Sequence, residues 1–274
     1  MRAGLIQMRS TEDREENLCH AEALCREAAS RGADLVALPE NFSFVRSMGM
    51  APARPEPLDG PLVARFGALA RELRIWLLLG SVPETISPDH PRVYNTAIFF
   101  DRAGEIRAVY RKIHLFDIRM PGGPSIRESE TIEAGERVVV ADSEFGKVGL
   151  SICYDLRFPE LYRWQARSGA RLLLVPSAFT ERTGRDHWHV LARARAVENL
   201  CFLLAPAQWG QHGGRRSSYG HTLIVDPWGR VVAEKAEGEG VLEWEVDLEE
   251  VDRVRATLPA LEHARTWLLG EDDA

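Results

Sequence analysis

The sequence predicts one α/β domain in which mixed β-sheets carry helices on their outer faces. Apolar runs of strand length alternate with longer segments that have one apolar face, an order typical of strand–helix–strand crossover units. Two hairpins, turning at residues 101–105 and 226–229, add antiparallel strands to this order. No stretch rich in proline, glycine or serine divides the chain, so we expect a single domain over residues 1–274.

The first half of the chain is expected to alternate strands with helices. The first helix can be capped by Ser10 or Thr11 and ends at Gly32. Cys19 and Cys25 fall on this helix, and we expect neither thiol to have a chemical role. The elements expected here are strands at 3–8, 33–40, 75–84, 94–100 and 106–113 and helices at 10–32 and 60–74.

The second half repeats the alternation and ends in a helix. The second hairpin spans residues 220–236, with Gly229 in its turn. A last helix is expected from about Leu248. The other elements expected here are strands at 147–155, 171–179, 201–208 and 240–247 and helices at 158–169 and 186–200.

Composition excludes several classes of protein. The formal net charge is -7, and the arginines are scattered, which argues against a nucleic-acid binder. No apolar run approaches the roughly 18 residues of a membrane span, and the start of the chain does not resemble a signal peptide. The four cysteines lack CxxC spacing, so neither a disulfide framework nor structural zinc is expected. We therefore expect a cytoplasmic protein.

Three apolar strands lead into a reactive side chain. Glu40 ends the strand at 33–40, Lys112 lies near the end of the strand at 106–113, and Cys153 follows the apolar residues of the strand at 147–155. Side chains just past the carboxyl ends of strands collect in one crevice of an α/β sheet. Taken singly, each residue has an ordinary structural explanation: a solvated loop acid, an edge-strand lysine and a core cysteine.

Together, the three side chains predict acyl transfer through a thioester. A free thiol titrates near pH 8.5, so a nucleophilic cysteine needs a base or a nearby cation. The Glu40 carboxylate can be that base if burial raises its pKa, and the Lys112 ammonium can stabilise an oxyanion. The backbone N–H of Tyr154 can be the second oxyanion donor. This chemistry requires no metal ion and no cofactor.

Three segments resemble the motifs of the nitrilase superfamily, also called carbon–nitrogen hydrolases. They are LPENF at 38–42, YRKIHLFD at 110–117 and ICYDLRFPE at 152–160, and the resemblance covers nearly the whole chain. It implies that Glu40, Lys112 and Cys153 form a catalytic triad. It also implies that Glu128 supports the lysine and the attacking water, that the fold is a four-layer αββα sandwich, and that the protein is a homodimer.

Two further segments, 176–199 and 215–229, resemble the Nit subgroup of this superfamily. The resemblance implies an amidase that releases ammonia from a small-molecule amide. Deaminated glutathione is the expected substrate, α-ketoglutaramate is the alternative, and nitrile or N-carbamoyl substrates remain open. The subgroup usually has glutamate after its His-Trp pair, whereas this chain has His189, which leaves the substrate less defined.

Substrate-binding residues are expected on loops that follow strands, although packing explains each of them as well. A substrate with carboxylates needs cationic partners, and Arg157 follows the nucleophile closely. Arg215 and Arg216 are expected to be solvated loop charges. The pocket walls are expected to include Phe42, Phe179, Thr183 and Tyr219.

Other classes of function remain open at this stage. A Cys-His hydrolase would use one of four histidines as its base. A metal-assisted hydrolase would use the sequence DHWH, but two histidines that are two residues apart on a helix point to different sides. A non-catalytic interaction protein would have no use for the three reactive side chains. The histidines available as a base are His114, His187, His189 and His221.

Overall fold

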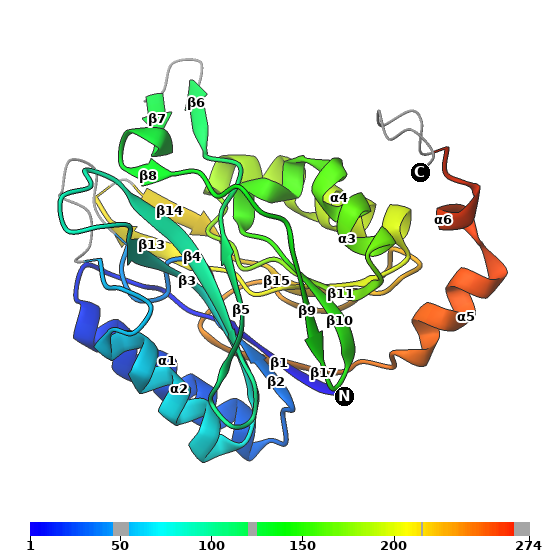
Figure 1. Ribbon diagram of the computed structural model, residues 1–274, viewed down its shortest axis with the longest axis horizontal. Coiled ribbons are helices and arrows are strands. Elements are labelled where there is room, and N and C mark those ends of the chain that lie inside the picture. The colour runs from blue at the N-terminus through cyan, green and yellow to red at the C-terminus, as the bar shows by residue number, and fades with distance from the viewer. Residues whose placement is uncertain (46–54, 120–124, 215, 266–274) are drawn as a thin grey trace.

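Two β-sheets lie face to face in the middle of the molecule, and helices cover the outer face of each (Figure 1). The computed structural model describes residues 1–45, 55–119, 125–214 and 216–265. The four layers follow the order helices, sheet, sheet, helices. They confirm the predicted α/β class with mixed sheets.

The first sheet has seven strands. They are β1 (Arg2–Gln7), β2 (Leu35–Ala37), β3 (Trp76–Thr85), β4 (Val93–Phe100), β5 (Ile106–Arg111), β8 (Ile132–Glu133) and β17 (Gly240–Glu245). Their order is β17-β1-β2-β3-β4-β5, with β8 beside β4. β1, β2 and β3 are parallel, and the two edges of the sheet are extended by the antiparallel strands β17, β4 and β5.

The second sheet repeats this design with six strands. They are β9 (Val139–Ser143), β10 (Gly146–Leu150), β11 (Ala170–Leu174), β12 (Phe202–Ala205), β15 (Thr222–Val225) and β16 (Val231–Lys235). Again three strands, β10, β11 and β12, are parallel, and antiparallel strands flank them. Two separate ribbons pair β6 (Asp117–Arg119) with β7 (Ser125–Arg127) and β13 (Trp209–Gly213) with β14 (Arg216–Tyr219).

Four helices form the outer layers. Helices α1 (Arg14–Ser30) and α2 (Pro61–Leu73) cover the first sheet, and α3 (Pro159–Arg167) and α4 (Glu181–Asn199) cover the second (Figure 1). The short helices η1 (Glu128–Glu130) and η2 (Cys153–Arg157) lie in connections. The chain then continues through α5 (Glu249–Thr257) and α6 (Ala260–His263), which lie to one side of the sandwich (Figure 1).

Strand alternation creates two apolar layers on the first sheet. Leu5 and Ala37 face the second sheet and join the central core, whereas Ile6 and Val36 join the core beneath α1 and α2. Successive side chains of a strand point to opposite faces, and both faces of this sheet are covered, so the strands are apolar throughout. The two cores fix the strand ends from which the polar residues described below project.

The predicted helix at 10–32 differs from the structure at its start. Asp13 is the N-cap, because its carboxylate accepts a hydrogen bond from the Glu16 N–H at 3.0 Å. Ser10 is buried, and its hydroxyl donates to the Phe42 carbonyl at 2.8 Å. The prediction of a Ser10 or Thr11 cap was therefore wrong, because tertiary contacts claim the Ser10 hydroxyl.

Several strands were not predicted, and several predicted strands are shorter than expected. β9 and the short strands of the two ribbons are half-exposed in large part, so their sequences lack a continuous apolar run. The strand expected at 33–40 covers only Leu35–Ala37. Those expected at 147–155 and 171–179 end at Leu150 and Leu174, and they are followed by η2 and by an irregular segment. Among the described residues, no helix is both long and apolar enough to cross a membrane.

Candidate active site

Glu40 lies just after β2, in a segment that is pressed against β3. A Cβ atom on Gly80 would lie 2.0 Å from the Leu38 carbonyl oxygen and 2.4 Å from that of Pro39, so only glycine fits at this crossing. The next residue, Asn41, has a left-handed backbone with φ 56°, and its N–H donates to the Ser81 hydroxyl at 2.9 Å. The end of β2 is thereby held in one conformation, with Glu40 buried.

The carboxylate of Glu40 accepts hydrogen bonds on both oxygens. Lys112 Nζ donates to Oε1 at 2.9 Å, and Asn95 Nδ2 donates to the same oxygen at 3.0 Å. The backbone N–H of Ala178, four residues after β11, donates to Oε2 at 2.9 Å. Groups that follow strands of both sheets therefore meet at this carboxylate.

Lys112 follows β5 and is 2 % exposed. Its ammonium lies between two carboxylates, because it also donates to Glu128 Oε1 at 3.0 Å and Oε2 at 2.9 Å. Glu128 is the first residue of η1, and its Oε2 also accepts the Phe116 N–H at 2.6 Å. The lysine is thus a buried point charge with a fixed position, and it is not an edge-strand charge.

Cys153 lies on a sharp turn between β10 and η2. Its backbone is left-handed, with φ 48°, which is uncommon for a residue other than glycine. Its N–H donates to the Pro176 carbonyl at 3.0 Å, so the segment after β11 holds this turn. Glu40 and Lys112 are both close enough to shift the pKa of the Cys153 thiol, Glu40 raising it and Lys112 lowering it. The structure therefore brings Glu40, Lys112, Glu128 and Cys153 together.

Asp155 connects the cysteine turn to β5. Its buried carboxylate accepts hydrogen bonds from the Tyr110 hydroxyl at 2.7 Å and from the backbone N–H groups of His114 at 3.0 Å and Ile152 at 2.8 Å. The His114 ring, which also contacts this carboxylate, stacks on Phe158 with the ring centroids 3.6 Å apart. These contacts fix the turn relative to the segment that carries Lys112.

The charges of the site set its protonation state. Burial opposes ionisation of Glu40, but the charge of Lys112 and the hydrogen bonds hold the pKa of Glu40 below its usual value. Burial also opposes the charge of Lys112, but Glu128 and Glu40 raise the pKa of the ammonium well above its usual value. Burial, followed by the negative charge of Glu40, raises the pKa of the Cys153 thiol. The resting site therefore holds a carboxylate, an ammonium and a neutral thiol.

This charge pattern corrects one expectation from the sequence. Burial alone would raise the pKa of Glu40, but Lys112 lies 2.9 Å away and reverses the direction. Because Glu40 stays ionised, it is ready to accept a proton from the thiol. Because the thiol is neutral at rest, this transfer has to be driven by the bond that the sulfur forms with its substrate.

Three residues expected at the substrate pocket lie near Cys153, namely Tyr154, Arg157 and Phe179. The Arg157 guanidinium lies 5.7 Å from the ring centre of Tyr154 and 5.4 Å from that of Phe179. It also contacts His187 Nδ1 at 3.2 Å. Aromatic rings thus hold Arg157 in place beside the cysteine turn.

The other three expected pocket residues have structural partners. Phe42 is fully buried and packs edge-on against Phe66 at 5.1 Å, in the core beneath α1 and α2. The Thr183 hydroxyl contacts the Thr180 hydroxyl at 2.8 Å in the first turn of α4. The Tyr219 ring stacks on the ring of His221, with the centroids 4.0 Å apart. Ordinary packing, which the sequence left open, therefore describes Phe42 best.

Of the two arginines expected to be solvated, Arg215 lies outside the described residues. Arg216 begins β14 and is half-buried, so it lies on a strand and not on the expected loop. Its positive charge contributes to the low pKa of Glu40. It is therefore a second cation, besides Arg157, near the site.

The four histidines considered as bases have other partners. His114 contacts Asp155, His187 contacts Arg157, and His189 and His221 both contact Glu234. Among the described contacts, none joins one of these rings to Cys153. His187 and His189 contact different groups, as their spacing on a helix predicts.

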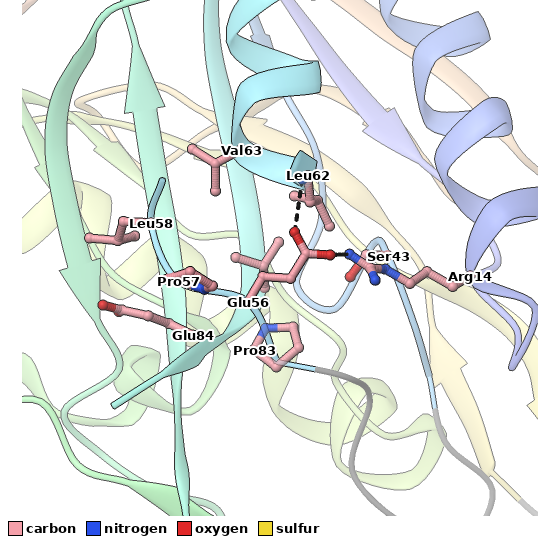
Figure 2. Close-up of a pocket in the computed structure, with 10 residues that line it drawn as sticks. Arg14, Ser43, Glu56, Pro57, Leu58, Leu62, Val63, Pro83 and Glu84 are labelled. Atoms are coloured by element: carbon pink, nitrogen blue, oxygen red, sulfur yellow. Dashed lines mark hydrogen bonds and ion pairs between the residues drawn. The ribbon is translucent and has the colours of Figure 1, made fainter. Parts of the chain in front are cut away.

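A separate small cavity lies beneath the start of α2 and is shown in Figure 2. Glu56 pairs there with Arg14 and accepts the Leu62 N–H at 2.8 Å. The cavity has a volume of about 10 Å³, which can hold at most one water molecule. Neither Cys153 nor Lys112 lines it, so it is a structural feature and not the substrate site.

Sequence reasoning missed the groups that position the reactive side chains. Asn95 lies within the buried strand β4, and its side-chain NH₂ group donates to Glu40 and, at 3.4 Å, to Glu128. A polar residue in an apolar strand is the signal that could have revealed it. The backbone donor of Ala178 has no signal in the sequence, and the roles of Tyr110 and Asp155 depend on a contact between distant segments.

Comparison with known proteins identifies the family. The model of the carbon–nitrogen hydrolase family matches residues 2–256. The chain belongs to the carbon–nitrogen hydrolase family.

Relatives of this carbon–nitrogen hydrolase agree in sequence and in structure. The deaminated glutathione amidase of Synechocystis is 41 % identical over 263 residues, which cover 95 % of this chain and 97 % of the relative. Nit3 of Saccharomyces cerevisiae, a member of branch 10 of the nitrilase superfamily, is 34 % identical, with a TM-score of 0.83 and 94 % of each chain covered.

A solved amidase shows chemistry at the cysteine. A glutamate-to-glutamine variant of the amidase from Nesterenkonia sp. AN1 carries the acetamide moiety of fluoroacetamide on its active-site cysteine. It is 28 % identical, with a TM-score of 0.79, and the match covers 98 % of this chain and 95 % of that one. The present protein is accordingly a hydrolase of carbon–nitrogen bonds, with amidase activity.

Proposed function

We propose that this amidase hydrolyses deaminated glutathione through a cysteine thioester. The observation that carries the proposal is the meeting of Cys153, Glu40 and Lys112 in a chain that is 41 % identical to a deaminated glutathione amidase over nearly its full length. The geometry supplies a nucleophile, a base and a cation at one point. The identity of the substrate rests on the relatives, and the chemistry rests on the site.

The first half-reaction forms the thioester. The Glu40 carboxylate accepts the thiol proton while the Cys153 sulfur attacks the amide carbonyl carbon. The π electron pair moves to the carbonyl oxygen, where the Lys112 ammonium and the Tyr154 N–H stabilise the negative charge. Tyr154 lies in the first turn of η2, where backbone donors lack intrahelical acceptors. The intermediate collapses, and Glu40 returns its proton to the departing amine, which is cysteinylglycine for deaminated glutathione and ammonia for α-ketoglutaramate.

The second half-reaction regenerates the thiol. Glu40 accepts a proton from water, and the oxygen attacks the thioester carbon. The carbon–sulfur bond breaks, and the sulfur regains a proton from Glu40, so the products are a carboxylic acid and free enzyme. Glu128 holds Lys112 through both of its oxygens, and it is the second carboxylate available to orient this water.

Substrate carboxylates would be held by the cations beside the site. Arg157 is fixed by aromatic rings next to the cysteine turn, and the charge of Arg216 reaches Glu40. Guanidinium groups bind carboxylates with two parallel hydrogen bonds. Deaminated glutathione extends well beyond its amide, whereas α-ketoglutaramate, the alternative substrate, is short and needs a nearby cation.

The test is release of α-ketoglutarate, the acid product common to both substrates, from deaminated glutathione and from α-ketoglutaramate at equal low concentrations. A higher kcat/KM for deaminated glutathione supports the proposed substrate, and the reverse order assigns an ω-amidase instead. Cys153→Ala should abolish hydrolysis of both amides without unfolding the protein, and retained activity would refute the mechanism. If neither amide reacts but Cys153 is alkylated rapidly by iodoacetamide, the chemistry stands and the substrate assignment fails.

We also propose that the enzyme is a cytoplasmic homodimer. All four cysteines are free, which suits a reducing compartment. Large apolar side chains are exposed on α3, on α4 and in the turn after β15, and a second copy of the chain would cover them. These side chains are Trp164, Val190, Val197 and Trp228.

A further inference from the structure

A cluster of metal-ligating side chains lies outside the proposed catalytic site. His189 projects from α4, His221 follows β14, and Glu234 lies on β16. Glu234 Oε1 is 2.8 Å from His189 Nε2 and 2.5 Å from His221 Nδ1. All three ligand atoms lie within 4.8 Å of one another. Three separate elements therefore direct two imidazoles and one carboxylate to the same point.

Surrounding contacts hold both rings in position. His221 has a left-handed backbone, with φ 57°, and its carbonyl accepts the Trp188 indole N–H at 2.8 Å. Its ring stacks on Tyr219, with the centroids 4.0 Å apart. The His189 ring packs edge-on against His221 at 5.1 Å. Metal sites depend on such outer contacts, which fix the orientation of the ligands.

We propose that His189, His221 and Glu234 form a binding site for a divalent transition-metal ion, with Zn²⁺ as the ion that fits best. Two histidines and one glutamate form a ligand set that zinc accepts, and solvent water can supply the fourth position. The ligand side chains are 21 to 34 % exposed, so an ion can enter from solvent. The carboxylate offsets part of the charge of the ion.

The change needed to admit the ion is small. Zinc bonds of about 2.0–2.1 Å place tetrahedral ligand atoms about 3.3 Å apart. The histidine–glutamate contacts would open by less than 1 Å, and the two rings would approach each other. The two ring nitrogens that now contact Glu234 would bind the ion through their lone pairs, and a neutral ring would then carry its N–H on its other nitrogen.

The site would connect α4 to the second hairpin. Glu234 lies opposite Leu223 in the β15–β16 pair, and Tyr219, which stacks on His221, donates its N–H to the Phe179 carbonyl at 2.9 Å. The segment that contains Phe179 also provides the Ala178 donor to Glu40. None of the three ligands contacts Cys153 or Lys112 in the described structure. The ion is therefore a structural brace, and amide hydrolysis does not require it.

The test is equilibrium dialysis of the full chain against Zn²⁺ after removal of metal by a chelator. Cys153→Ala serves as the background, because a reactive thiol binds zinc by itself. In this background, His189→Asn and His221→Asn are compared with His20→Asn, which alters a solvent-exposed histidine near Glu239. Asparagine tolerates the left-handed backbone at position 221, so the variant should fold.

The expected result is one Zn²⁺ per chain, with an affinity that falls at least about tenfold in both cluster variants and is unchanged in His20→Asn. A saturating excess of Zn²⁺ should raise Tm by about 5 °C in the background protein and less in the cluster variants. Bound Co²⁺ should give the visible absorption of a tetrahedral site. Equal binding by all variants, or the absence of stoichiometric binding at micromolar Zn²⁺, would overturn the proposal.

Discussion

At the scale of single residues, the site keeps its base, Glu40, ionised and its nucleophile, Cys153, neutral at rest. Lys112 lowers the pKa of Glu40, and burial together with the negative charge of Glu40 raises the pKa of Cys153, so the proton rests on sulfur until substrate arrives. This arrangement protects the thiol from oxidation, because the thiolate is the reactive form. It also makes the carboxylate indispensable, since only Glu40 is placed to accept that proton in the described site.

Replacing the base tests this assignment. Glu40→Gln keeps the size of the side chain and removes the proton acceptor, so kcat should fall by about 10²–10⁴-fold. Steady-state release of α-ketoglutarate measures the loss. Glu56→Gln is the matched control, because it changes the ion-paired carboxylate of the small cavity in Figure 2 and should leave kcat unaltered. A decrease of less than tenfold for Glu40→Gln would assign the base to another group.

At the scale of elements, the cysteine turn is held to β5 through Asp155. The carboxylate is fully buried and is satisfied by Tyr110, by two backbone donors and by the His114 ring. A buried carboxylate that loses a donor is costly, because water cannot replace it. The hydroxyl of Tyr110 therefore supports both the stability and the geometry of the site.

Tyr110→Phe should reduce the free energy of unfolding by about 1.5–3 kcal/mol, the range for a hydrogen bond to a charged group. Urea denaturation measures this loss of unfolding free energy, and kcat should fall in the same variant. Tyr94→Phe on the adjacent strand is the control, because that half-buried ring packs under Arg111. If both variants lose the same stability, the Asp155 contact has no special importance.

A buried histidine on β13 predicts how stability depends on pH. Burial and, more weakly, the charges of Arg216 and Arg9 lower the pKa of His212 to about 4, although its hydrogen bond with the Ser10 carbonyl opposes the shift. The unfolded chain then binds a proton near pH 6.5, before the folded protein does. The stabilisation is complete above about pH 6.5 and is lost as pH falls towards 4, with a total on the order of 3 kcal/mol.

Urea denaturation at pH 7, 5.5 and 4.5 measures this dependence. The free energy of unfolding should fall less steeply with acid in His212→Gln than in the unaltered protein. The same slope in both proteins would show that other groups cause the loss. His20→Gln, a change at an exposed ring, should reproduce the slope of the unaltered protein.

At the scale of the whole molecule, each half of the chain supplies the three parallel strands of one sheet and the two helices that cover it, and β17, from the second half, adds an edge strand to the first sheet. The halves pack sheet to sheet, which brings the segments after β2 and β5 of one half against those after β10 and β11 of the other. The apolar residues that remain exposed on α3 and α4 are on the outside of this sandwich.

Sedimentation should therefore give twice the chain mass of 30.7 kDa. Val190→Lys, at a side chain that is 62 % exposed on α4, should shift the species towards the monomer. Ile106→Lys changes a side chain of similar type that is 41 % exposed on β5, and it should leave the dimer intact. A monomer in the unaltered protein would contradict the proposal, and equal effects of the two variants would place the interface elsewhere.

Most of the main elements were predicted from periodicity, and the element ends were predicted least well. The apolar runs of β1, β3, β4 and β12 are distinct because both faces of these strands are covered. β9 and β14 were missed because pairing with a neighbour, and not an apolar run, defines them. The start of α1 was misplaced because Ser10 has a tertiary partner.

The sequence by itself determined the α/β class, the family resemblance and the three reactive residue types, because hydrophobic period and local motifs are properties of short segments. Only the tertiary structure decided the charge state of Glu40, the contributions of Asn95 and the Ala178 N–H, the burial of Phe42, and the meeting of His189, His221 and Glu234. The physical reason is that pKa values and hydrogen-bond partners depend on distances between segments far apart in the chain, and those distances exist only after the two sheets have packed.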